Sequence, residues 1–348
     1  MRFSNKFDEN SVIKRMKYYM ENYNFFTYID TKDKINYTTS TKDRSCRFCK
    51  KKFSKKEFSK KAHAIPELLG NKNIISKDEC DECNEFFGKK LEDSLSKFLG
   101  LERNIHQISG KNGIPSYMSN NKAIRIDEVD GKIIVQQQIK GKEAIKIDKE
   151  KKEIILHEDG VQFCPIAIYK ALVKIGISIL PPEELEYFQD TINWLKENNH
   201  SNSMKSYAFI LVKYIPRELR DFYYPLKVIG FIRKNNDFFK PYYQVLIEFR
   251  NTSYQFMVPC KNKECIVLKN DEIILPVIPG THETEDFIGI SQVVSRVEIL
   301  SEHNKITTSG RDFRFKYEKF EDIPINNKKY DELLQELNVP RKKWLNKK

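Results

Sequence analysis

Two Cys-x-x-Cys pairs constrain this chain more than any other feature of its sequence. Cys46 and Cys49 form the first pair, Cys80 and Cys83 form the second, and 30 residues separate the pairs. A tight Cys-x-x-Cys turn directs both of its sulfurs to one point, so two such turns can supply four thiolates in tetrahedral geometry. The short segment around them, residues 44–100, has little core of its own. We therefore predict a structural zinc ion that contributes much of its stability.

The cysteine count and the hydropathy indicate where such a chain works. Seven cysteines, an odd number, fit a metal site in a reducing compartment better than a disulfide framework. The first ten residues, MRFSNKFDEN, lack the apolar core of a signal peptide. Mean hydropathy is -0.60, and no apolar run approaches the roughly 18 residues that a membrane helix needs. We expect a cytoplasmic protein with no membrane partner.

The length and the order of elements predict an α+β fold with more than one domain. A chain of 348 residues exceeds the usual about 100–200 residues per domain, and helices followed by antiparallel strands are typical of the α+β class. We expect a small zinc-stabilised module followed by a larger α+β domain. The predicted parts are an N-terminal helical and extended segment (1–43), the cysteine module (44–100), a β-rich connector (101–160), a regulatory or substrate-binding α+β domain (161–338) and a basic tail (339–348).

Turn and helix signals punctuate the middle of the chain. Short alternating apolar runs over 120–158 predict strands, and Asp130-Gly131 is a strong two-residue hairpin signal. Residues 165–180 carry apolar side chains at helical spacing. Pro182 is well placed to begin a second helix.

The C-terminal half is rich in strand patterns. The third and fourth of its apolar runs, separated by Asn251-Thr252, are expected to pair antiparallel, and a last short helix is expected at 330–337, before Pro340. The five runs are SYAFILVKYI, PLKVIGFIRK, YYQVLIEFR, SYQFMV and EIILPVI.

Positive charge is concentrated beside the first cysteine pair. Lys and Arg number 61 against 49 acidic residues, a formal net charge of +12. Residues 42–61 hold ten basic and two acidic side chains, a local net of +8. A Lys- and Asn-rich genome would explain the total but not this concentration, so we favour phosphate contact here. The basic residues around Trp344, at 341–348, are interpreted as a disordered end.

A histidine and an asparagine are tied to the predicted zinc site. His63 lies between the cysteine pairs in a loop that zinc would close, with Pro66 fixing the turn after it, and Asn84 directly follows Cys83. A lone histidine is more often structural. Here one metal site would anchor both a general-base candidate, His63, and a polar ligand, Asn84.

The residues after Asn84, NEFFGKKLEDSLSKFLG, predict one helix. At roughly 100° per residue, Glu92 lies near the packed face on the side of Asn84, and Asp93 points more toward solvent. Glu92 is the better candidate for a catalytic cation, although an ordinary charge on the helix flank explains it equally well. The apolar stripe and the C-cap comprise Phe87, Leu91, Leu95, Phe98 and Gly100.

Taken together, CRFC, AHAIPELLGNK and CDECNEFFGKKLED resemble the HNH endonuclease family, in the branch with Cys-x-x-Cys, His-Ile-x-Pro, Gly-Asn and Cys-x-x-Cys-Asn motifs. The resemblance covers residues 44–100, under a fifth of the chain. It implies a ββα-metal fold, in which a hairpin presents the histidine and a helix presents the asparagine and a metal ligand.

The resemblance also implies roles for the site residues. His63 would activate water for attack on a phosphodiester of DNA, with RNA left open. Asn84 would orient the site or bind a catalytic Mg²⁺ or Mn²⁺ ion, and Glu92 would be a further ligand. The four cysteines, Cys46, Cys49, Cys80 and Cys83, would hold structural zinc. Such modules occur fused to sensing domains in bacterial anti-phage defence, so a regulated effector is a natural expectation.

One position departs from the family pattern. Many relatives carry an acidic or histidine ligand directly before the histidine, where this chain has Ala62. The catalytic ion would then depend on Asn84, Glu92, water and substrate oxygens. The alternative is a catalytically decayed, zinc-stabilised nucleic-acid-binding protein. The C-terminal domain leaves open a small-molecule activator, a protein partner or a homo-oligomer.

Other polar and aromatic residues carry no chemistry in this interpretation. His106, His157, His200, His282 and His303 are taken as surface or structural residues, and Cys164, Cys260 and Cys265 as buried free thiols. A run of strand aromatics could stack on bases, but cross-strand packing is the favoured explanation. It comprises Tyr242, Tyr243, Phe249, Tyr254 and Phe256.

Overall fold

The computed structural model describes most of the chain and divides it into two compact units. The described residues are 9–31, 33–110, 113–129, 132–137, 144–204, 207–214, 225–238, 240–263, 275–279, 294–320, 332 and 335. Unit 1 comprises Met1–Phe98 and Phe163–Ile306, and unit 2 comprises Leu99–Gln162 and Thr307–Lys348. The five-part division along the chain is a separate matter and stays a prediction.

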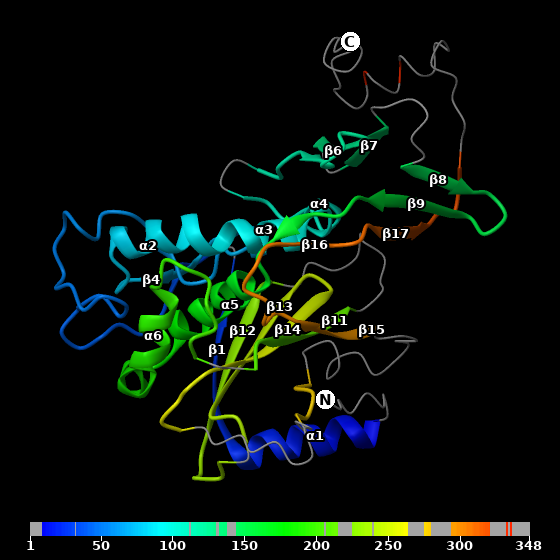
Figure 1. Ribbon diagram of the computed structural model, residues 1–348. Coiled ribbons are helices and arrows are strands. Elements are labelled where there is room, and N and C mark those ends of the chain that lie inside the picture. Colours follow the sequence, from blue (N-terminus) through cyan, green and yellow to red (C-terminus); the bar gives the residue numbers. More distant parts are fainter. Residues whose placement is uncertain are drawn as a thin grey trace. The chain divides into compact units, whose positions relative to one another are not determined.

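Unit 1 is built on a six-stranded sheet in which every neighbouring pair is antiparallel (Figure 1). The predicted pairing of the third and fourth apolar runs is confirmed, since Phe249 pairs with Thr252 and Tyr243 with Val258. In spatial order the strands are β1 (Tyr23–Ile29), β12 (Lys227–Arg233), β13 (Tyr243–Phe249), β14 (Thr252–Val258), β11 (Phe209–Tyr214) and β15 (Val294–Ile299).

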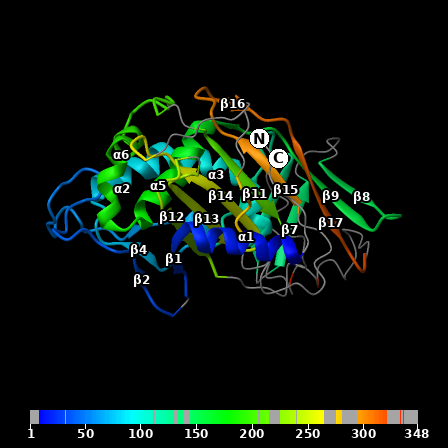
Figure 2. The same cartoon turned by 90° about the horizontal axis from the view of Figure 1, so that it is seen from below.

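Helices cover both faces of this sheet. On one face α1 (Glu9–Asn22) packs through Tyr19 against Leu246 (Figure 2). On the other face α5 (Pro165–Ile179) packs closely enough that the Tyr243 hydroxyl donates to the Gly176 carbonyl oxygen at 3.0 Å. Because successive strand side chains point to opposite faces, β13 contributes to both layers, and all seven of its residues are buried.

The α5 helix is buried along its whole length. Its predicted apolar positions are confirmed, but its two lysines, Lys170 and Lys174, are buried as well. The following segment begins as predicted at Pro182, first as the 3₁₀ turn η3 (Pro182–Phe188) and then as α6 (Gln189–Leu195).

The segment with both cysteine pairs belongs to unit 1. It contains a small three-stranded sheet in the order β2 (Asn36–Tyr37), β4 (Ile74–Ser76), β3 (Ala62–His63), and the short turn η1 (Glu67–Leu69). The predicted helix is present but not uniform. It runs as α2 (Asp81–Phe87), a π-helical turn η2 (Gly88–Glu92) and α3 (Asp93–Leu99).

The described part of unit 2 contains short antiparallel sheets and the short helix α4. Its core includes Leu101, Ile124, Ile126 and Leu156. The predicted hairpin is confirmed by the pairing of Val129 with Lys132, although its two turn residues lie outside the described part. The elements are α4 (Glu102–Ile105), a sheet of β5 (Tyr117–Met118), β6 (Ile124–Val129) and β7 (Lys132–Gln137), and a sheet of β17 (Arg311–Lys316), β9 (Glu153–Glu158) and β8 (Ile145–Asp148). Two short strands, β10 (Gln162–Phe163) and β16 (Ile306–Thr307), span the unit boundaries.

Four local predictions need correction or lie outside the described residues. The turn between β13 and β14 consists of Arg250 and Asn251, because Thr252 already pairs in the sheet. Residues 275–278 of the last apolar run form no strand. Most of the predicted helix at 330–337 and all of the basic tail lie outside the described residues.

The structure agrees with the α+β class predicted from the sequence, with antiparallel sheets and a four-cysteine cluster in the segment that lies, along the chain, between β1 and the other strands of the larger sheet. None of the helices in the described part of the chain has the length and apolar character that crossing a bilayer requires.

Candidate active site

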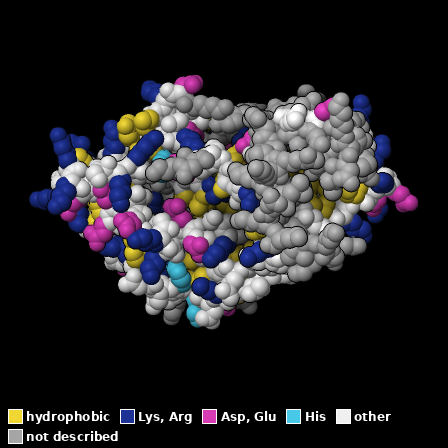
Figure 3. All heavy atoms as spheres, turned by 90° about the horizontal axis from the view of Figure 1, so that it is seen from above, with side chains coloured by type: hydrophobic (Ala, Val, Ile, Leu, Met, Phe, Trp, Pro, Cys, Tyr) yellow, Lys and Arg dark blue, Asp and Glu magenta, His cyan; other side chains and the backbone are white. Residues whose placement is uncertain are grey.

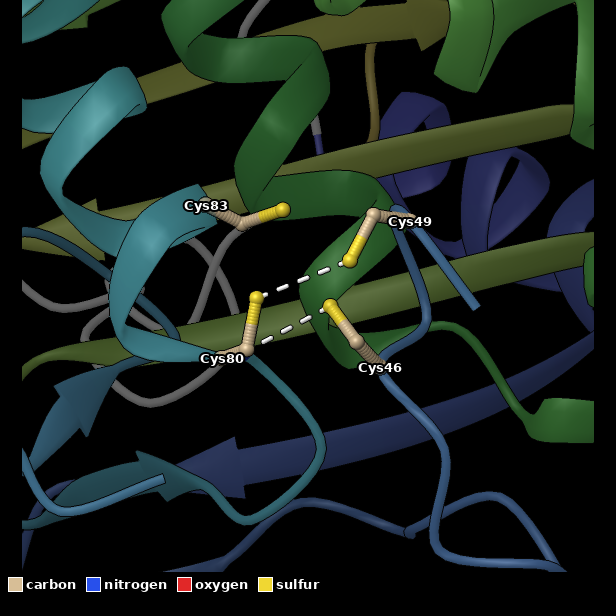
Figure 4. A group of neighbouring side chains, drawn as sticks. All are labelled: Cys46, Cys49, Cys80 and Cys83. Atoms are coloured by element: carbon tan, nitrogen blue, oxygen red, sulfur yellow. Dashed lines mark hydrogen bonds between the residues drawn. The ribbon is translucent and has the colours of Figure 1, made fainter. Parts of the chain in front are cut away.

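The four predicted cysteines converge on one point. The sulfur atoms of Cys46, Cys49, Cys80 and Cys83 all lie within 4.8 Å of one another (Figure 4). Zinc–sulfur bonds of about 2.3 Å in tetrahedral geometry place sulfurs about 3.8 Å apart, and Cys49 Sγ lies 3.6 Å from Cys80 Sγ. The donor set therefore fits a structural zinc ion.

The thiols of this cluster are coupled in a way that favours a cation. A hydrogen bond from the Cys83 thiol lowers the pKa of Cys46 to about 5, and the same bond raises the pKa of Cys83. Burial raises the pKa of Cys80 to about 12. One thiolate forms readily, but further deprotonation brings like charges together out of water. A bound zinc ion would offset that cost, since metal binding and deprotonation are linked.

Arg47, inside the first Cys-x-x-Cys turn, ties the cluster to the rest of unit 1. Its side chain is fully buried and pairs with Asp78 through Nε at 2.8 Å and Nη2 at 2.9 Å. Nη1 donates to the carbonyl oxygens of Ile177 at 2.6 Å and Leu180 at 3.2 Å. These carbonyls lie at the C-terminal end of α5, so the turn is fixed to a helix far along the chain.

His63 lies on the short strand β3, in the stretch of chain between the two cysteine pairs. It pairs with Ile75 across β3 and β4, and the Ala64 amide donates to the Ile74 carbonyl oxygen at 3.1 Å. The fully buried Asn71 braces the loop between these strands. Its side chain donates to the carbonyl oxygens of Ile65 at 2.6 Å and Ile74 at 2.9 Å. The imidazole is thus carried by a braced backbone.

The environment of His63 favours the neutral form of its imidazole. Burial lowers its pKa below the usual value of 6.5, and the nearby carboxylate of Glu67 partly offsets this by raising it. His63 Nε2 lies 3.7 Å from Glu67 Oε1, and the two side chains are 20% and 28% exposed. A neutral imidazole that still reaches solvent can accept a proton from water.

Glu92 occupies the border position that the sequence predicts. It is half-buried, whereas Asp93 is exposed and pairs with Lys97 at 2.8 Å. Burial raises the pKa of Glu92; the positive charge of Lys174 lowers it and the carboxylate of Glu67 adds to the rise. A cation would stabilise the charged form of such a carboxylate.

Asn84 lies on α2, directly after Cys83. Its backbone N–H donates to the Cys80 carbonyl oxygen at 3.0 Å. The structure thus brings the cysteines together, pairs His63 with Glu67, and couples Glu92 electrostatically to Glu67. Within the described residues, the four cysteines form the single group of three or more His, Cys, Asp or Glu side chains that could hold a metal ion. The roles of His63, Asn84 and Glu92 therefore stay predictions.

The basic strip at 42–61 is only partly available for phosphate contact. Counting Arg47 in it is wrong, because that guanidinium is buried against Asp78. Lys51 is paired with Glu57 at 3.2 Å and with Glu82 at 2.9 Å. Figure 3 shows Lys and Arg side chains, interspersed with Asp and Glu, on the part of unit 1 that carries this loop. The exposed members include Lys50, Lys52, Lys55 and Lys56.

The remaining candidates behave as structural residues where they are described. Cys164 and Cys260 are buried free thiols, as predicted, while Cys265 and His282 lie outside the described residues. His106 is buried, and His157 pairs with Asp312 at 2.9 Å. The strand aromatics Tyr242, Tyr243, Phe249, Tyr254 and Phe256 are buried, so they form core and not a base-stacking platform.

Sequence reasoning missed three residues near the site. Glu67 is the first residue of η1, four residues after His63, and this i,i+4 spacing could have revealed it. Glu79 and Lys174 form a buried ion pair at 2.9 Å. No local signal could have linked the two residues, because 94 residues lie between them in the sequence. Only the fold brings α5 to the cysteine segment.

Comparison with known families bears on this segment directly. Residues 46–99 match the model of a family described as HNH endonuclease, which confirms the resemblance inferred from the motifs. No curated protein and no solved structure matches the chain.

Proposed function

We propose, from the HNH endonuclease segment at residues 46–99, that this protein is a metal-dependent endonuclease that hydrolyses phosphodiester bonds in DNA. The observation that supports it best is the combination of that match with a four-cysteine cluster whose two cysteine pairs flank the half-buried His63 in the sequence. We place the protein in the cytoplasm, as an effector of anti-phage defence whose larger domain regulates the nuclease.

His63 is the general base in this proposal. Its neutral imidazole takes a proton from the water that attacks the phosphorus atom, and Asn84 orients the site. Glu92 and Asn84 supply oxygen donors that suit Mg²⁺ or Mn²⁺, with water and phosphate oxygens completing the shell. Such an ion, when bound, polarises the scissile phosphate and stabilises the leaving oxygen.

The exposed lysines of the 42–61 loop support a nucleic-acid substrate. Lys50, Lys52, Lys55 and Lys56 contact the phosphate backbone in this proposal, which positions the duplex without selecting a sequence. Cleavage and binding should therefore both weaken steeply as salt is raised.

Plasmid nicking with Mg²⁺ or Mn²⁺ tests the proposal. Wild type should convert supercoiled DNA to nicked or linear forms, and His63→Ala should lose about 100-fold or more, as expected for a general base. His157→Ala is the matched control, because that imidazole lies on β9 and pairs with Asp312. Equal cutting by wild type and His63→Ala would refute the assignment of the base. A parallel assay with an RNA substrate determines whether the protein cuts DNA, RNA or both.

The catalytically decayed binding protein remains the second candidate, and Ala62 is the observation that favours it. The position before His63 holds a buried methyl group, 2% exposed, in place of a metal ligand. This candidate predicts salt-sensitive DNA binding with no cleavage under any divalent ion. A protein that is inert alone but cuts after addition of cell extract or nucleotides would instead indicate a regulated nuclease.

A further inference from the structure

Two buried lysines lie one turn apart on α5 and have different partners. Lys170 Nζ donates to the carbonyl oxygen of Trp194 at 2.8 Å and lies 3.7 Å from Glu197 Oε2. It therefore binds the C-terminal end of α6. Lys174 reaches the cysteine segment instead. A buried ammonium group is costly unless it is paired, so the partners of Lys174 indicate what it holds in place.

Lys174 contacts three parts of the HNH segment, residues 46–99. Its Nζ lies 2.9 Å from Glu79 Oε2, and the two side chains are 4% and 0% exposed. The same Nζ donates to the His63 carbonyl oxygen at 3.4 Å. It also lies 5.8 Å from the ring centroids of Phe48 and Phe87. One cation therefore pairs with the residue before Cys80, donates to the strand of the proposed base, and lies near two aromatic rings.

We propose that Lys174 is a positioning residue for the nuclease site. By holding the His63 carbonyl and the Glu79 carboxylate together, it fixes where the imidazole lies relative to the zinc-anchored helix. The inference rests on the proposed function, in which His63 is the base. Lys174 lies outside residues 46–99, so the larger sheet-bearing part of unit 1 supplies a component of the site through α5.

A double substitution separates positioning from simple charge pairing. Lys174→Met alone leaves Glu79 as an unpaired buried charge, which is strongly destabilising whatever else Lys174 does. Adding Glu79→Gln removes that charge, so the double variant isolates the loss of the contact with the His63 strand. Lys170→Met is the matched control, since it removes a buried lysine from the same helix without touching the cysteine segment.

Single-turnover plasmid cleavage, zinc content and melting temperature are measured for each variant. The double variant should keep its zinc and its fold but cut about 10- to 100-fold more slowly, the cost of a small misplacement of a reacting group. Lys170→Met, measured where it is folded, should cut at the wild-type rate. Wild-type cutting by the folded double variant would show that Lys174 only neutralises Glu79, and would overturn the proposal.

Histidine-labelled NMR gives a readout that does not depend on activity. The imidazole resonance of His63, assigned with His63→Ala, should shift in the Lys174→Met/Glu79→Gln variant and stay in place in Lys170→Met. An unchanged His63 resonance in the double variant would overturn the positioning role. If wild type cuts no substrate, the proposed function fails while this measurement still decides whether Lys174 positions the histidine.

Discussion

His63 combines two properties that a general base requires. Burial lowers the pKa of its imidazole, yet a fifth of the side chain remains exposed to solvent. Glu67 acts in the opposite direction, because its carboxylate stabilises the protonated imidazole. Burial and the neighbouring Glu67, Lys61 and Lys72 together set the pKa of this imidazole.

The pH profile of cleavage should report that balance. Only neutral His63 accepts a proton, so a lowered pKa keeps cleavage active below the ordinary imidazole value of 6.5. Glu67→Gln removes the group that raises this pKa, and the acid limb of kcat/KM should move to lower pH. The pKa of Glu92 should also fall in Glu67→Gln, because the Glu67 carboxylate raises it in the wild type.

Glu82→Gln is the control for this profile. Glu82 is an exposed carboxylate on α2 that pairs with Lys51, and its loss should leave the acid limb where it is. An acid limb that moves to higher pH in Glu67→Gln would contradict the assignment of His63, since no loss of a carboxylate can raise the pKa of an imidazole it contacts.

At the scale of elements, the cysteine cluster holds together segments that pair little with one another. β3 and β4 are two and three residues long, and two-stranded pairings of that length are marginal alone. We expect Cys80→Ser to lose zinc, measured by elemental analysis, and to lower the melting temperature by about 10 °C or more, because structural zinc contributes folding free energy directly.

Cys164→Ser is the matched substitution for that measurement. Cys164 is a buried free thiol outside the cluster, so this variant should keep its full zinc content. Zinc loss in both variants, or in neither, would contradict the assignment of the metal to the four clustered cysteines.

Two glycines in and after the helical run Asp81–Leu99 should respond oppositely to alanine. Gly88 has helical dihedral angles, φ -57° and ψ -47°, and nothing lies within 4 Å of an added Cβ. Gly88→Ala should stabilise by about 0.4–1 kcal/mol. Gly100 has φ +48°, and its Cβ would lie 2.5 Å from Glu158 Oε1, so Gly100→Ala should destabilise by about 1–3 kcal/mol. Urea unfolding measures both, and a stabilised Gly100→Ala variant would contradict this account.

These elements show what local sequence can and cannot predict. The stripe of Phe87, Leu91 and Leu95 and the cap at Gly100 follow from helical period and glycine freedom, and the structure has them. The π-helical turn at Gly88–Glu92 does not. This turn lies against α5, a contact that no window of the sequence contains.

At the scale of the molecule, the nuclease segment and α5 are interdependent. Sequence patterns correctly predict the α5 helix, but an apolar helix with lysines gives no sign of what those lysines reach. Arg47 shows the same limit from the other side. Its place in a basic strip suggests solvent and phosphate, whereas it is buried against Asp78 and the carbonyls that end α5. Burial of a charge depends on a partner, and these partners are distant in sequence.

This interdependence predicts how residues 44–100 behave as a separate polypeptide. The peptide should still bind zinc through its four thiolates, but Arg47 would lose its carbonyl partners on α5 and Glu79 would lose Lys174. Phe87 and Leu91 would also be uncovered, and a fragment of this size has little other core to offset the loss. Its zinc complex should therefore show poorly dispersed amide NMR signals and no cooperative thermal transition, whereas the full chain with zinc should unfold cooperatively. A zinc-bound fragment with a sharp transition would show that the HNH segment is an autonomous domain, and the role given to α5 would then have to be abandoned.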